Sequence, residues 1–378
     1  MGGGLGGLAV ALALARNGTS VHVLEKEREF TEVGAGIQLA PNASRALDRL
    51  GVLHAIEPFA VFPQRIRWMN ALSGELVTSL DLGPPFRERY NYRYVVMHRS
   101  DLLRVLVEAC RANERITLET NCSVVGIEDD GDGVRVRCAD NKQYEAALVV
   151  GADGLWSTVR KSIVDDGDPV CSQYVAYRGA IPIEDVSQHA GLDNVVVWTG
   201  PNMHLVQYPL RRGELYNQVA VFKSNRYRAD SEDWGTPAEL DEHFRITAPA
   251  VRTALTTIKR NRRWPMYDRP PIASWSRKRT VLMGDAAHPM LQYLAQGACQ
   301  ALEDAVALGD ALAANPNDLA RAFGAYEKSR IAHTARVVTT ARAWGQLWHV
   351  PSAEIDRRDA MLATRRPDDY RETDWLYG

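Results

Sequence analysis

Residues 279–312 read RTVLMGDAAHPMLQYLAQGACQALEDAVALGDAL, and they decide the fold that we expect for the rest of the chain. The pattern predicts a short strand ending at Met283, a turn of small residues, and a helix beginning near Gly297. The strand ends on Gly284-Asp285, whose carboxylate can accept hydrogen bonds from the hydroxyl groups of a ligand. Unpaired N–H groups at the start of the helix form an anion site. Together these features suit a flavin nucleotide, although an ordinary strand–loop–helix connection has the same pattern.

The opposite end of the chain carries a second nucleotide-type pattern. Residues 2–7, GGGLGG, fit G-x-G-x-x-G with Gly2, Gly4 and Gly7 in the three glycine positions. A helix rich in Ala and Leu follows, and the next strand ends on Glu25, where a carboxylate typically holds the ribose of adenosine. The sequence therefore predicts binding of an adenine dinucleotide. A glycine-rich loop used only for packing is the alternative.

One part of this pattern is missing. The glycines normally follow a central strand of the parallel sheet, but Met1 directly precedes them. We therefore expect a sheet without this strand, and weak binding of the dinucleotide.

Composition excludes several classes of function. The chain has 378 residues and a net charge of -2, without the basic excess of a nucleic-acid-binding protein. Its five cysteines are scattered and lack CxxC spacing, so we expect reduced thiols, a cytoplasmic protein and no metal site. No apolar run approaches the length of a membrane span.

The middle of the chain supplies further candidate residues. Arg99 opens a helix and could reach a pyrophosphate or a flavin edge, or could be an ordinary exposed arginine. Asp153 lies in GADG after an apolar strand, where it could also be only a turn residue. His204 and Tyr208 share one face of a predicted strand, because side chains alternate along a strand. Such a pair could bind or deprotonate a phenol, whereas the alternative is a half-buried strand with satisfied polar tips. We further expect one amphipathic helix over residues 236–258.

Three landmarks now stand in order: GGGLGG with Glu25, GADG at 151–154, and GDAAHP at 284–289. This set resembles the single-component FAD-dependent aromatic hydroxylases, and the resemblance covers essentially the whole chain. Three longer strings are similar to the 3-hydroxybenzoate 6-hydroxylases, which form gentisate. They are NMHLVQYPLRRGELYNQVAVF (202–222), HPMLQYLAQGA (288–298) and DYRETDWLYG (369–378).

The resemblance implies an α/β fold: a Rossmann-type FAD-binding domain, an inserted β-sheet substrate domain and a C-terminal helical segment. The FAD-binding domain would comprise residues 1–62, 93–173 and 273–345. The substrate domain would comprise residues 63–92 and 174–272. The tail, 346–378, would be helical. Because the residues from Ser352 onward are rich in charge, we expect that part to pack on the surface.

The family also implies roles for individual residues. Gly2, Gly4, Gly7 and Glu25 would hold the ADP half of FAD. Arg99, Gly284 and Asp285 would hold its pyrophosphate and ribityl region, and Asp153 would serve FAD and the pyridine nucleotide. Pro289, Gly297 and Ala298 would border the isoalloxazine ring, while His204, Tyr208 and Gln292 would surround the aromatic substrate.

The implied reaction is hydroxylation of a phenolic aromatic acid, most specifically conversion of 3-hydroxybenzoate to gentisate. NADH or NADPH would be a transient co-substrate, and oxygen would be activated at the C4a carbon of the flavin. A salicylate or 6-hydroxynicotinate type of monooxygenase, which displaces a ring substituent, remains open. So does an inactive FAD-fold protein with an interaction role, and so does a homodimer.

Overall fold

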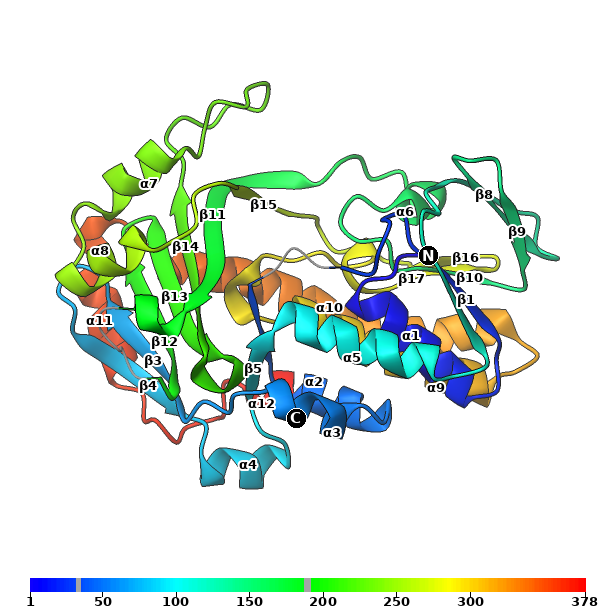
Figure 1. The fold of residues 1–378 in the computed structure, drawn as a ribbon, viewed down its shortest axis with the longest axis horizontal. Coiled ribbons are helices and arrows are strands. Elements are labelled where there is room, and N and C mark those ends of the chain that lie inside the picture. Colours follow the sequence, from blue (N-terminus) through cyan, green and yellow to red (C-terminus); the bar gives the residue numbers. More distant parts are fainter. Residues whose placement is uncertain (32–34, 187–191) are drawn as a thin grey trace.

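A seven-stranded sheet occupies one end of the molecule, and short parallel strands with their helices form the centre and the other end (Figure 1). The computed structural model describes residues 1–31, 35–186 and 192–378. Within these ranges, no helix combines the length and the apolar character needed to cross a membrane.

The nucleotide-type part is built from helices packed on two short parallel sheets. Helix α1 (Leu5–Arg16) is buried along most of its length because its residues are nearly all Ala, Leu and Val. It packs against α9 (Gly297–Ala314) and α5 (Arg99–Arg111). The parallel strand pairs are β1 (Val21–Leu24) with β6 (Ile116–Glu119), and β10 (Val149–Gly151) with β17 (Thr280–Leu282). Strand β16 (Ser276–Arg277) continues the second sheet.

Met1 and Gly2 lie between the carboxyl ends of these two parallel sheets. The Gly2 N–H donates to the carbonyl of Leu24 at 2.9 Å, and the Ala152 N–H donates to the carbonyl of Met1 at 2.9 Å. Among the described residues, no strand pairs with both β1 and β10. The turn before α1 is therefore held by hydrogen bonds to both sheets.

The seven-stranded sheet stands at one end of the molecule, beside the central helices (Figure 1). Its order is β15-β11-β14-β13-β12-β3-β4. The strands are β3 (Arg65–Asn70), β4 (Leu76–Asp81), β11 (Val170–Pro182), β12 (Asn194–Gly200), β13 (Met203–Leu210), β14 (Leu215–Lys223) and β15 (Trp264–Asp268). One face packs under α7 (Pro237–Phe244) and α8 (Pro249–Thr256), through Phe222, Leu240 and Val251 among others. The opposite face, which carries His204, Val206 and Tyr208, looks toward the nucleotide-type part.

Two local predictions were wrong. The single helix expected over 236–258 is the pair α7 and α8, because Pro249 lacks an N–H group and holds Ala248 in an extended conformation. The sequence of residues 34–53 predicts a loop and then a short helix with Pro41 in its first turn, but the part before Pro41 contains β2 (Gly36–Leu39), which pairs with β5 (Val95–His98). Residue 34 of that stretch lies outside the described residues.

The remaining elements cover the edges. An antiparallel sheet contains β7 (Val124–Asp129), β8 (Val134–Cys138) and β9 (Gln143–Ala146). The short helices are α2 (Pro41–Arg49), α3 (Leu53–Ile56), α4 (Pro84–Tyr90) and α6 (Thr158–Ile163). The sequence predicts one long helix from Leu319 to Gln346, and the structure has it as α10 (Leu319–Trp348). The chain then ends in α11 (Ile355–Ala363) and α12 (Asp374–Tyr377).

Candidate active site

A cavity of about 520 Å³ lies between the inner face of the seven-stranded sheet and the nucleotide-type part. Nine of the predicted site residues line it: Gly4, Arg99, His204, Tyr208, Gly284, Asp285, Gln292, Gly297 and Ala298. The other five lie outside its wall: Gly2, Gly7, Glu25, Asp153 and Pro289. Residues far apart in the chain, such as Gly4 and Ala298, therefore meet at one cavity.

Two glycines of the glycine-rich turn have different surroundings, because Gly7 packs against protein and Gly4 borders the open cavity. A Cβ atom on Gly7 would lie 1.9 Å from the carbonyl oxygen of Gly2, so this position must be glycine for α1 to pack. A Cβ atom on Gly4 would meet no protein atom within 4 Å, although Gly4 lines the cavity. Helix α1 starts directly after Gly4 and has no side-chain cap, so its first N–H groups face a space kept open for a ligand.

These two glycines give a direct test of the cofactor site. Gly4→Ala should leave the thermal unfolding temperature of the apoprotein within about 2 °C, because the new methyl group meets no protein atom. It should weaken FAD binding at least about tenfold, because the phosphates need close approach to this backbone. Gly7→Ala is the matched control and should destabilise the apoprotein itself. Unchanged FAD affinity in Gly4→Ala, measured by flavin fluorescence titration, would place the cofactor elsewhere.

The carboxylates of Glu25 and Asp153 accept hydrogen bonds from backbone N–H groups of the protein. The Glu25 carboxylate accepts from the N–H of Gly3 at 2.6 Å and therefore supports the glycine-rich turn. Asp153 accepts from the N–H of Thr158 at 2.8 Å and from the Ser157 hydroxyl, which fixes the start of α6. Both residues position the loops around the cavity, whose wall includes Ala152 and Gly154 on either side of Asp153.

Arg99 and Asp285 place opposite charges on the cavity wall. Burial lowers the pKa of Arg99, and the charge of Asp285 counteracts part of that shift. Arg99 begins α5, and Asp285 follows β17, as predicted. A cation for phosphate and an anion for hydroxyl groups suit the pyrophosphate and ribityl parts of a flavin dinucleotide.

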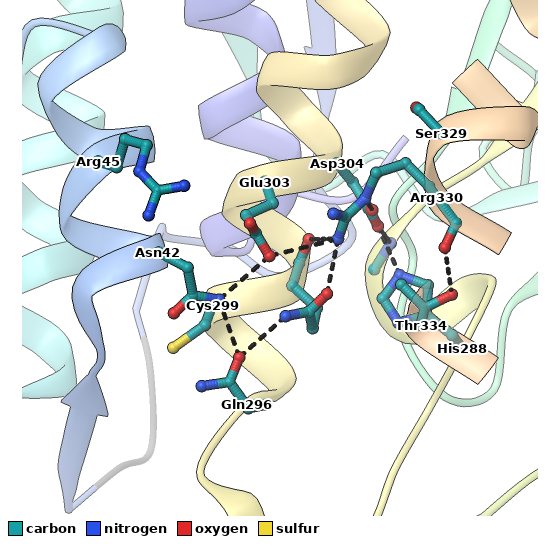
Figure 2. A network of polar contacts seen from close by, with 12 residues as sticks. Asn42, Arg45, His288, Gln296, Cys299, Glu303, Asp304, Ser329, Arg330 and Thr334 are labelled. Carbon is teal, nitrogen blue, oxygen red and sulfur yellow. Dashed lines mark hydrogen bonds and ion pairs between the residues drawn. The ribbon is translucent and has the colours of Figure 1, made fainter. Parts of the chain in front are cut away.

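A buried polar network supports the loop between β17 and α9 (Figure 2). Asp304, which is 0% exposed, accepts from the N–H of Gly284 at 2.9 Å and from Arg330 at 2.7 Å, and it pairs with His288 at 2.5 Å. Burial alone would raise the pKa of Asp304, but His288 and Arg330 lower it to about 2. The carboxylate therefore stays charged and holds Gly284 in place. The sequence analysis did not select Asp304. The signal for it was an acidic residue inside the apolar stretch ALEDAVAL.

The network continues to the start of α9. Arg330 donates to the side-chain oxygen of Gln300 at 2.7 Å, and Gln300 donates to Gln296 at 2.9 Å (Figure 2). Asn42 of α2 also donates to Gln296 at 2.9 Å. Because Gln296 precedes Gly297, these contacts fix the helix start whose free N–H groups face the cavity. Pro289 is buried in the same loop, and its neighbour Met290 forms the wall instead.

His204 is the most deeply buried titratable group on the sheet side of the cavity wall. It is 1% exposed, and its Nδ1 lies 2.7 Å from Nε2 of His349. Its Nε2 has no hydrogen-bond partner among the described residues. Burial, and secondly His349, lower the pKa of His204 well below its usual value, so the ring is neutral. The aromatic rings of Tyr293 and Trp348 contact it edge-on.

Three further polar side chains complete the wall. Tyr208 is two residues from Val206 on the same face, and burial raises its pKa. Gln292 lies on the supported loop. Arg178, which the sequence analysis did not select, lies on β11, and its guanidinium is 4.0 Å from the centre of the Trp264 ring.

The C-terminal tail does more than pack on the surface, contrary to the prediction. Trp375, Leu376 and Tyr377 line the cavity, and Leu376 and Tyr377 are buried. Arg45 of α2 donates to the carbonyls of Tyr377 and Gly378 and so fastens the end of the chain. The apolar and aromatic residues of α12 explain why it is drawn inward.

The comparisons with known proteins agree with this geometry. The family described as "FAD binding domain" matches residues 1–341. A 3-hydroxybenzoate 6-hydroxylase of Klebsiella oxytoca is 40% identical over 383 residues, covering 100% of this chain and 95% of the relative. A 3-amino-4-hydroxybenzoate 2-monooxygenase of Streptomyces platensis is 35% identical, covering 100% of this chain and 94% of the relative.

The fold is similar to that of a solved flavoprotein. The structure of Klebsiella pneumoniae HpxO complexed with FAD and uric acid superposes with a TM-score of 0.87 at 25% identity, covering 100% of this chain and 96% of that chain. The mixed α/β architecture is thus that of the FAD-binding hydroxylases. The chain belongs to the FAD-binding monooxygenase family, and it is an FAD-dependent aromatic monooxygenase.

Proposed function

We propose that this enzyme hydroxylates a phenolic aromatic acid, with 3-hydroxybenzoate as the substrate and gentisate as the product. The observation that carries the proposal is the free Nε2 of His204, on the wall of the cavity that the FAD-type residues also line. A phenol needs a hydrogen-bond acceptor of this kind for its activation. The similarity to 3-hydroxybenzoate 6-hydroxylase supports the choice of substrate.

The residues present fit FAD. The turn for its ADP half would be formed by Gly2, Gly4, Gly7 and Glu25. The pyrophosphate and ribityl region would be held by Arg99, Gly284 and Asp285. The backbone at Gly297 and Ala298 would meet the ring, next to the loop that contains Pro289, and Asp153 would position the neighbouring loop. When bound, FAD supplies the chemistry that passes electrons from NADH or NADPH to oxygen. In this proposal, residues 63–92 and 174–272 form the substrate domain, and residues 1–62, 93–173 and 273–345 form the FAD-binding domain.

The protein's own groups then act on the substrate. His204 accepts the phenolic proton at Nε2, which makes the ring electron-rich. Tyr208 and Gln292 orient the ring so that the carbon para to the hydroxyl faces the flavin. Trp348, Val206 and Tyr293 make the surroundings apolar and exclude water.

The environment of Arg178 is an argument that the substrate carries a negative charge. Burial, and then the nearby cations Arg99 and Arg262, lower the pKa of Arg178 to about 10, and no carboxylate of the described residues is among the groups that act on it. Its Nε has no hydrogen-bond partner among the described residues. A partly buried cation without a counter-ion among the described residues is costly, so Arg178 favours a ligand that brings a carboxylate.

Product analysis with NADH or NADPH tests the proposal. The FAD-supplemented protein should convert 3-hydroxybenzoate to gentisate in step with pyridine-nucleotide oxidation. The uncharged analogue 3-hydroxybenzamide should show a KM at least about tenfold higher, because it offers Arg178 no charge. Formation of catechol from salicylate would instead identify salicylate as the substrate. Product formed only from 3-amino-4-hydroxybenzoate would identify that compound as the substrate, an alternative that the 35% identical relative supports.

A further inference from the structure

The buried contact between His204 and His349 carries one more inference. His349 follows the last residue of α10, is 5% exposed, and does not line the cavity. It comes from a different part of the chain, 145 residues from His204, yet the two rings are 2.7 Å apart at Nδ1 and Nε2 and lie nearly parallel at 22°. Its contact is therefore with the ring of His204 and not with the cavity.

The described residues around His349 favour a neutral imidazole. Burial, and then the cation Arg358, lower the pKa of His349 to about 3. The groups packed on it from other elements are the rings of Tyr174 and Tyr293, together with His204 itself. Within the part of the chain that the structure describes, no carboxylate is among the groups that act on His349. Both imidazoles are therefore neutral in the substrate-free protein at ordinary pH.

Two neutral imidazoles in direct contact share one proton between the facing nitrogens. If that proton belongs to His349, His204 must carry its own proton on Nε2, and it can then only donate to a ligand. If the proton belongs to Nδ1 of His204, the Nε2 atom keeps a lone pair. The hydrogen bond of one ring nitrogen thus decides what the other nitrogen offers.

We propose that His349 is a positioning residue that accepts the Nδ1–H of His204 and thereby leaves Nε2 of His204 as the acceptor for the phenolic proton. This inference rests on the proposed function. When the phenol O–H bond breaks, an Nε2–H bond forms, and the imidazolium of His204 faces the phenolate. That negative charge compensates the burial that otherwise keeps the ring neutral, so the transfer depends on bound substrate. His349 itself gains and loses no proton.

Two variants separate this role from packing. His349→Leu removes the acceptor, and His349→Gln offers a carbonyl oxygen that can replace it. The first measurement uses the FAD-loaded, substrate-free protein labelled with ¹⁵N-histidine. We expect His204 to carry its proton on Nδ1 in the wild type and in His349→Gln, and on Nε2 in His349→Leu. A wild-type His204 protonated on Nε2 would overturn the proposal.

The second measurement is the pH at which bound 3-hydroxybenzoate ionises, followed by its ultraviolet difference spectrum. This pH should rise by about one unit or more in His349→Leu, a tenfold change in the ionisation equilibrium, and by less in His349→Gln. His349→Leu should therefore hydroxylate 3-hydroxybenzoate more slowly than the wild type. The rate should recover with ring-fluorinated substrates, because their phenols are more acidic and ionise more easily. An unchanged ionisation pH in His349→Leu would reduce His349 to packing. If the wild type hydroxylates no phenolic acid, the proposed function fails, whereas the ¹⁵N result still decides the position of the proton.

Discussion

His204→Ala is expected to lower the rate of 3-hydroxybenzoate hydroxylation by about 10²- to 10⁴-fold, the usual contribution of a general base. The variant loses the only nitrogen on the cavity wall, within the described residues, that is both buried and free to accept the phenolic proton. NADH oxidation should continue and yield hydrogen peroxide, because the residues that we propose to hold FAD are untouched. The measurement compares gentisate formed with NADH consumed.

The control for this variant is His54→Ala, which removes an imidazole that is 96% exposed and lies in α3, away from the cavity. It should leave the hydroxylation yield unchanged. Bound flavin, measured from its visible absorbance, should remain stoichiometric in both variants. A His204→Ala enzyme that still couples NADH oxidation to gentisate would exclude His204 as the base and would turn attention to Tyr208.

The parts of the fold that depend on local pattern could be predicted from sequence. The helix starting at Gly297 follows from the small residues before it, and α10 follows from its continuous periodicity. Strand alternation placed His204, Val206 and Tyr208 on one face, and all three line the cavity. These features need only neighbours within a few residues, so one sequence contains the information.

Contacts between distant segments could not be predicted in the same way. His349 meets His204 across 145 residues, and Arg330 meets Asp304 across 26. From sequence alone, a histidine after a helix or an acid inside a helix could have any of several ordinary roles. Only the packing of two elements against each other shows which role His349 or Asp304 has. The inward turn of Tyr377 has the same origin, since it depends on Arg45 and on an apolar surface formed elsewhere.

The buried carboxylate of Asp304 should have the largest effect on stability. Asp304→Ala is expected to lower the free energy of unfolding by about 3–5 kcal/mol, because it leaves the guanidinium of Arg330, 7% exposed, without its closest counter-ion. FAD affinity should fall as well, since the N–H of Gly284 loses its acceptor and the loop carrying Asp285 loosens. Urea denaturation of the apoprotein and flavin titration measure the two effects.

The same helix offers the control, because Asp310 of α9 pairs with Arg49 at 2.7 Å but is 55% exposed. Asp310→Ala should cost less than about 1 kcal/mol. The double variant Asp304→Ala/Arg330→Met removes both charges and should recover part of the loss, since much of the cost is the unpaired cation.

The pH dependence follows from the lowered pKa of the Asp304 carboxyl, about 2 when folded against an ordinary value of 3.8. Its contribution to stability is present above pH 4 and is lost as the pH falls through about 2. Equal stability of Asp304→Ala and Asp310→Ala at pH 7 would mean that the network does not support the loop. Any loss of FAD affinity in Asp304→Ala would then need another cause.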